Sequence, residues 1–131
     1  MQSNSSKVNP VKEKSFSFAV EIVRLCQELK QRREYVLSNQ LLRAGTSVGA
    51  NIEEALAGQS RRDFLSKMAI ASKEARETRY WLNILIHSSI LEADLKPYLE
   101  SVDELIRLLT AIVKSTKNST SIQNSKLRIE N

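Results

Sequence analysis

Residues 40–58 read QLLRAGTSVGANIEEALAG, and this stretch decides the fold of the 131-residue chain. Its apolar residues recur at the spacing of one helix face: Leu41, Val48, Ile52 and Ala55. Each glycine in it weakens a helix by about 1 kcal/mol relative to alanine, a cost that a helix keeps where another backbone comes close. The stretch therefore predicts a helix from about residue 37 to Ala57, packed tightly against a neighbour. Gly58 is expected to end it in a left-handed conformation.

Beside the apolar face runs a polar ribbon of four residues: Arg43, Ser47, Asn51 and Glu54. At about 100° per residue, all four lie within about 80° of one another. Polar side chains next to a buried face need hydrogen-bond partners. We interpret the ribbon as structural, with Arg43 and Glu54 meeting partners on the third helix or on a neighbouring subunit. A catalytic or ligand-binding site is the alternative.

Three further segments with helical periodicity complete an all-α, antiparallel up-down-up-down four-helix bundle over residues 15–117. The helices are expected at about residues 15–31, 37–57, 60–87 and 95–117. A capping box at Ser60 marks the start of the third helix, and Pro97 lies in the first turn of the fourth. We expect residues 1–14 to form a flexible N-terminal arm and residues 118–131 a disordered polar tail.

The third helix is apolar on more than one side. Beyond its main stripe, a second flank carries Ile70, Trp81 and Ile84. The bundle offers only three partner helices, so this flank is a candidate subunit interface with Trp81 as its anchor. The alternative is that Trp81 fills the bundle core. The pattern predicts an oligomer rather than a monomer.

The charge of the chain favours an acidic partner, because 20 Lys and Arg face 15 Asp and Glu, a net charge of +5. Nucleic acid is the first such partner and a membrane surface the second. Candidate phosphate contacts form two clusters, near the first helix connection and at the start of the third helix: Arg24, Lys30, Arg32 and Arg33, then Arg61 and Arg62. These connections lie at opposite ends of an antiparallel bundle, so the clusters would mark two separate rims. Solvated, charged loops are the alternative interpretation.

The sequence lacks the signatures of enzymes and metal sites. Cys26 lies on an apolar helix face and is interpreted as a small buried side chain in a reducing compartment. The single histidine, His87, follows Ile84 by three residues, so the Glu-x-x-His pairs of di-iron bundles are missing. Zinc-ligand spacings, phosphate-binding loops and nucleophile elbows are also missing. We expect no catalytic residue, metal or cofactor, no membrane segment, and a cytoplasmic protein.

One family resembles this chain at fixed helical offsets. The residues that carry the resemblance are Gln40-Leu41-Leu42-Arg43-Ala44, Ser47-Val48, Asn51-Ile52, Glu54, Ser60 and Asp63-Phe64. They are similar to the four-helix-bundle proteins encoded in intervening sequences of bacterial 23S rRNA genes. Related to that family are the accessory variability proteins of diversity-generating retroelements. Two positions depart from its pattern, since Leu42 stands where a second Arg is common and Ala55 where Gly is common.

The resemblance covers about residues 15–116 and implies a function. It implies a ring-like homopentamer with a basic surface, no enzymatic activity, and binding of RNA or nucleoprotein. The rival hypothesis is a protein–protein adaptor that holds a partner enzyme such as a reverse transcriptase. RNA binding predicts a steep dependence of affinity on salt, whereas adaptor function predicts little dependence.

Overall fold

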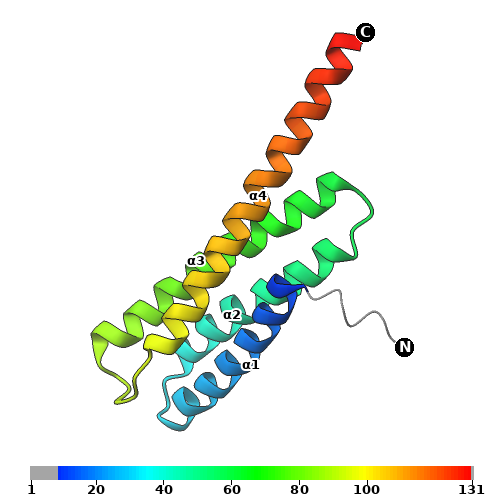
Figure 1. Cartoon of the computed structure of the whole chain (residues 1–131). Helices are drawn as coiled ribbons and strands as arrows, with labels where there is room; N and C mark the ends of the chain where they lie inside the picture. The colour runs from blue at the N-terminus through cyan, green and yellow to red at the C-terminus, as the bar shows by residue number, and fades with distance from the viewer. Residues whose placement is uncertain (1–8, 131) are drawn as a thin grey trace.

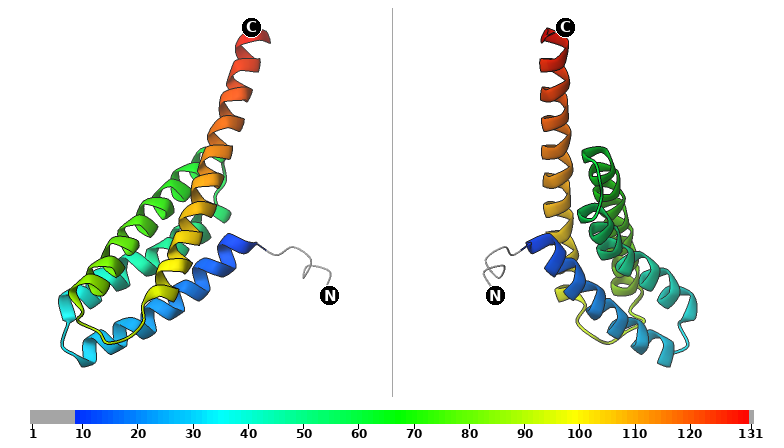
Figure 2. Two further views of the ribbon diagram at one scale, coloured as in Figure 1. Left: turned by 60° about the vertical axis from the view of Figure 1, so that its left-hand side comes forward. Right: turned by 90° about the vertical axis from the view of Figure 1, so that its right-hand side faces the viewer.

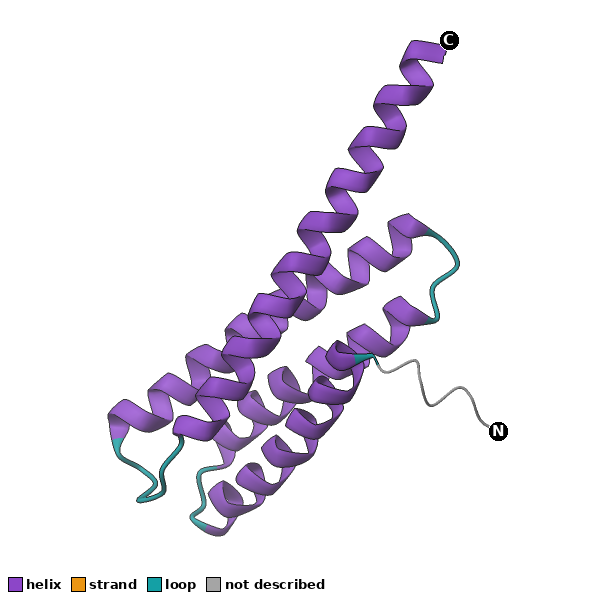
Figure 3. Cartoon of the chain, in the orientation of Figure 1, coloured by secondary structure: helices purple, strands orange, loops and turns teal. Residues whose placement is uncertain are grey.

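Four helices make up nearly all of the described chain, residues 9–130 of a computed structural model, with side chains described through Ser119. They are α1 (Pro10–Gln31), α2 (Tyr35–Leu56), α3 (Arg61–Ser88) and α4 (Lys96–Glu130). Figure 3 shows the short loops that join them. Within these residues there is no strand, so the predicted all-α class and the four helices are confirmed.

Each helix packs against the next one in the chain, and α1 and α4 share a smaller contact that closes the bundle. In the diagonal pairs, α1 with α3 and α2 with α4, no Cα atoms of the described residues come within 8 Å of each other. In Figure 1 the ribbon turns back at every connection, and Figure 2 shows α4 extending past the ends of the other helices. This arrangement turns the apolar face of every helix inward. None of the described helices is long and apolar enough to cross a membrane.

The core contains the apolar face that residues 40–58 predict, with Leu41, Val48 and Ile52 fully buried. The close approach at the glycines is to α1. A Cβ atom on Gly45 would lie 2.8 Å from the Cγ2 atom of Ile22, whereas one on Gly49 would lie 3.4 Å from the nearest α1 atom. The tight crossing of α1 and α2 therefore centres on Gly45.

Helices α1 and α4 are longer than predicted. α1 begins at Pro10, because Asn9 caps it by accepting a hydrogen bond from the Lys12 amide at 3.2 Å and proline suits a first helical position. Residues 10–14 are therefore helical, and residues 1–8 of the expected arm lie outside the described residues. α4 continues to Glu130 through the expected tail, since residues 98–131 contain neither glycine nor proline to end a helix.

The predicted left-handed cap at Gly58 is wrong. No described glycine has a positive φ, and α2 ends on Ala57 in a right-handed conformation. Left-handed residues lie instead after α3, where Ser89 has φ 57°, and after α1, where Arg33 has φ 64°. There the amide of Glu34 donates to the carbonyl of Leu29 at 2.9 Å, the bond that closes a Schellman motif. Ser60 caps α3 as predicted, since its hydroxyl accepts from the Asp63 amide at 3.0 Å, which is one of the two bonds of a capping box.

Candidate nucleic-acid interface

The first basic cluster lies at the α1–α2 turn, beside the α3–α4 connection (Figure 1). Arg24 pairs with Glu21 at 3.4 Å, and Lys30, Arg32 and Arg33 are exposed. Residues 21–34 and 87–103 meet at this end and hold five Lys and Arg against seven Asp and Glu. The α1–α2 end therefore carries no cationic excess.

The second cluster, Arg61 and Arg62, is exposed at the start of α3 and lies at the opposite end of the bundle. Here α4 runs alongside α3, and the Arg61 guanidinium donates to the Ser119 hydroxyl. Residues 105–129 of α4 contain five Lys and Arg and no Asp or Glu. The structure thus brings the predicted pair beside a basic helix segment that the sequence analysis did not single out.

The α3 arginines meet different kinds of partner on α4 along the contact between the two helices. Near the α3–α4 connection, Arg79 pairs with the Asp103 carboxylate at 3.3 Å. One turn earlier on α3, Arg76 donates to the hydroxyl of Thr110 at 3.1 Å. The arginine partner on α4 is therefore a carboxylate at one end of the contact and a neutral hydroxyl beyond it. Positive charge is left uncompensated toward the far end.

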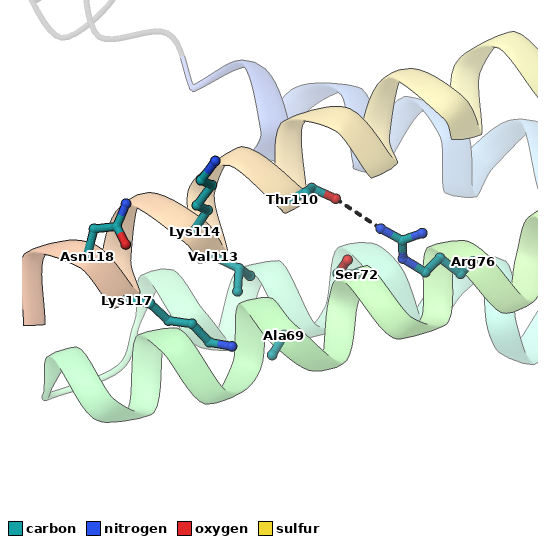
Figure 4. A pocket seen from close by; sticks show the side chains of 8 residues that line it. All are labelled: Ala69, Ser72, Arg76, Thr110, Val113, Lys114, Lys117 and Asn118. Atoms are coloured by element: carbon teal, nitrogen blue, oxygen red, sulfur yellow. Dashed lines mark hydrogen bonds between the residues drawn. The ribbon is translucent and has the colours of Figure 1, made fainter. Parts of the chain in front are cut away.

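An open groove of about 380 Å³ lies between these two helices (Figure 4). Its lining residues are Ala69, Ser72, Arg76, Thr110, Val113, Lys114, Lys117 and Asn118. In Figure 4 the Lys117 side chain reaches across toward α3, and Lys114 lies on the outer side of α4. No carboxylate lines the groove, so its charged groups are all cations. The signal in the sequence was the stretch without Asp or Glu after Glu104.

A second open hollow, of about 460 Å³, lies where the start of α3 meets α4 and is lined by Arg61, Phe64, Ser115, Thr116 and Ser119. Phe64 is half-buried and packs against the core. The structure places this ring beside Arg61. Most of the ring serves packing, and its exposed part lies in the hollow.

The polar ribbon lies on the surface of the α2–α3 contact. Arg43 pairs with Glu74 at 3.4 Å and also contacts Glu77, while Glu54 pairs with Lys67 at 2.7 Å. These partners all lie on α3 of the same subunit. The side chains of Arg43 and Glu54 are 51% and 58% exposed, so solvent screens both ion pairs. Removing one partner should therefore cost much less stability than it would for a buried charge.

The other two ribbon residues bond to their own helix. The Ser47 hydroxyl donates to the Arg43 carbonyl at 2.9 Å, and the Asn51 amide donates to the Ser47 carbonyl at 2.8 Å. Neither residue contacts another helix through these bonds. Within the described residues the ribbon is thus a set of local bonds and two surface ion-pair groups rather than a buried network.

The predicted interface residues of α3 are partly covered. Ile70 is 38% exposed, and Ile84 and Trp81 are half-buried. The Trp81 ring packs against the core while its indole N–H donates to the Glu77 carboxylate at 3.1 Å. Trp81 therefore fills the core in part and leaves an edge free. Their role in assembly stays a prediction.

Helix α1 has an exposed apolar side that sequence reasoning missed. Phe16 is 69% exposed and Val23 39% exposed, and the two are separated by two helical turns. Their periodicity was hidden by the buried stripe that contains Phe18 and Ile22. α1 and α3 thus both present apolar residues to solvent, from diagonal positions in the bundle.

Cys26 is buried between α1 and α2. Its thiol donates to the Ser38 carbonyl at 3.4 Å, and the Ser38 hydroxyl donates back to the Cys26 carbonyl at 3.2 Å. Burial raises the pKa of the Cys26 thiol, partly offset by the Ser38 hydrogen bond and by Lys30. In the part of the chain that the structure describes, no group of three or more His, Cys, Asp or Glu could hold a metal ion.

Comparisons with known proteins converge on one family. The model of the family described as 23S rRNA-intervening sequence protein matches residues 7–111. A crystal structure of a protein of unknown function, from the S23 ribosomal protein family of Bacteroides thetaiotaomicron VPI-5482, is 47% identical in sequence. The match covers 79% of this chain and 98% of the other, with a TM-score of 0.75. Among curated proteins, none matches.

Proposed function

Because this chain belongs to the 23S rRNA-intervening sequence protein family, we propose that it is a non-catalytic, oligomeric protein of the cytoplasm that binds RNA or nucleoprotein. The observation that carries the proposal is the cationic surface of α4, where residues 105–119 hold three exposed cations, Arg107, Lys114 and Lys117, and no acidic residue. Arg61 and Arg62 extend this surface at the start of α3. A surface of this kind attracts the phosphates of nucleic acid whatever their sequence.

The bundle is proposed to be antiparallel and to assemble as a ring-like homopentamer. A ring needs two different patches on each subunit, which pair head to tail. Exposed and half-buried apolar residues on two diagonal helices are candidates for such patches: Phe16 and Val23 on α1, and Ile70, Trp81 and Ile84 on α3. The number five, and a relation to accessory variability proteins, rest on the family resemblance. Five copies would raise the net charge to roughly +25.

The α1–α2 cluster is the second proposed rim for RNA. Lys30, Arg32 and Arg33 are exposed and available to phosphates, but Arg24 is engaged by Glu21. The acidic residues around this end weaken its attraction for a polyanion. The α2–α3 end is therefore proposed as the stronger of the two.

Fluorescence anisotropy tests the proposed function. Two labelled RNAs of unrelated sequence, a short strand of uridines and a hairpin, are titrated with the full chain at about 50 mM salt. Similar affinities for both are expected, since phosphate contacts carry no sequence information. Absence of binding to either RNA would favour the adaptor hypothesis, in which the partner is a protein such as a reverse transcriptase.

A further inference from the structure

We propose that the groove between α3 and α4 holds the phosphodiester backbone of the RNA, with Arg76 and Lys117 contacting phosphates from opposite walls. The inference rests on the proposed function and adds the place where the polymer lies. None of these residues belongs to the two clusters that the sequence pattern predicts. The groove therefore constitutes a third basic surface, along the side of the bundle rather than at an end.

The groove has the donors that a phosphate chain requires. Arg76 is anchored by one hydrogen bond to Thr110, and a guanidinium has five N–H donors, so several remain for phosphate oxygens. Lys117 supplies a positive charge from the α4 wall (Figure 4). Ala69 and Ser72 line the α3 side with small side chains, which lets a backbone approach closely.

The charge pattern points to an anionic occupant. Along the same helix contact, Asp103 neutralises Arg79, but no described carboxylate pairs with Lys114 or Lys117. Cations gathered along one groove without counter-charges repel one another, and a bound polyanion removes that repulsion. The uncompensated charge thus begins at Arg76 and continues toward the C-terminal half of α4.

The shape of the surface favours a polymer over a small anion. The groove is open to solvent, and its three cations come from two helices: Arg76 from α3, and Lys114 and Lys117 from α4. A small phosphate compound would occupy one part of this groove and leave the other cations unpaired. A backbone can follow the groove and meet cations from both helices, as in the basic channels of proteins that bind single strands without sequence preference.

A pair of matched charge reversals tests the inference. Lys114→Glu with Lys117→Glu changes the groove and leaves the Arg76–Thr110 bond intact. Arg32→Glu with Arg33→Glu makes the same charge change at the α1–α2 turn. A short labelled strand of uridines is the probe, and helix content and oligomer mass are checked for each variant.

The groove variant should lose about tenfold or more in affinity at about 50 mM salt, and its salt slope should flatten by about 1.4, or about 0.7 for each lost phosphate contact. The turn variant should lose at least about threefold less affinity than the groove variant, because acidic residues weaken the attraction of that second rim for RNA. Lys114→Arg with Lys117→Arg should bind like the wild type, because the charge is retained.

Every other result overturns the inference. Full binding by the groove variant with loss in the turn variant would place the site at the α1–α2 end. Equal losses in both would show attraction by net charge without a defined site. A large loss in the arginine variant, with helix content and oligomer mass unchanged, would show that the positive charge of the groove is not what binds the strand. Failure of the wild type to bind any RNA would overturn the proposed function as well, which separates that failure from the others.

Discussion

Gly45→Ala tests the tight crossing of α1 and α2. The new methyl group would lie 2.8 Å from the Cγ2 atom and 3.0 Å from the Cγ1 atom of Ile22, a fully buried side chain. Carbon atoms pack best at about 3.5–4.0 Å, so one of the two helices has to move. Ile22 is β-branched and has little rotamer freedom with which to avoid the contact.

The expected effect is a net loss of stability. Overpacking a core costs about 1–3 kcal/mol, and the 2.8 Å contact with a stiff side chain places this case in the upper half of that range. Alanine returns about 1 kcal/mol through its higher helix propensity. The free energy of unfolding should therefore fall by about 1–2 kcal/mol. For a domain of this size that lowers Tm by roughly 4–8 °C, measured by circular dichroism at fixed protein concentration.

Gly49→Ala is the matched control, since its Cβ would lie 3.4 Å from the Ser15 carbonyl oxygen, an ordinary contact. It should stabilise the protein by about 0.5–1 kcal/mol. In an Ile22→Ala background, Gly45→Ala should become neutral or stabilising, because the clashing atoms are gone. A Gly45→Ala variant that is more stable than the wild type would refute the reasoning.

Three further predictions follow from the fold. Arg33→Gly should raise the free energy of unfolding by about 0.5–1 kcal/mol, because glycine relieves the left-handed backbone at φ 64°; unchanged or lower stability in urea denaturation would contradict this. The buried Cys26 thiol has a raised pKa in the folded state, so the stability that it contributes is complete below its usual pKa and is lost as the pH rises through the folded value; wild-type stability should fall as the pH rises above about 8.5, and less so in Cys26→Ala. Light scattering at micromolar concentration should give a mass well above the 14.9 kDa of one chain, roughly 75 kDa for five copies, and Phe16→Glu should reduce it; a wild-type mass near 15 kDa would exclude the oligomer.

The core of the bundle was predictable from sequence because the helical spacing of the apolar residues and the position of a small residue point to the same buried helix face. Leu41, Val48 and Ile52 repeat at helical spacing and are fully buried, and Gly45 marks the close crossing. The helix ends were less predictable, because several signals compete at each one. Pro10 is compatible with a loop or with a first helical position, and Gly58 resembled a terminator although α2 ends at Leu56 with Ala57 as its C-cap.

The candidate site was only partly predictable, because it depends on which helices lie side by side. Clusters of adjacent basic residues, such as Arg61 and Arg62, are visible in the sequence. The groove joins Arg76 to Lys117, which are 41 positions apart in the sequence. Its positive charge depends on the absence of Asp and Glu among its lining residues rather than on a sequence motif. Neighbouring carboxylates from another helix, such as Asp103 beside Arg79, likewise show which cations are neutralised only once the structure places them.

The most direct test of RNA binding by this protein is the affinity of the full chain for one labelled RNA, measured from about 50 to 200 mM salt. Each neutralised phosphate of a single strand contributes about −0.7 to the slope of log affinity against log salt concentration. If six phosphates are neutralised across the oligomer, the slope should be about −4 and affinity should fall by more than a hundredfold. A slope near zero, or no binding at the lowest salt, would contradict the account.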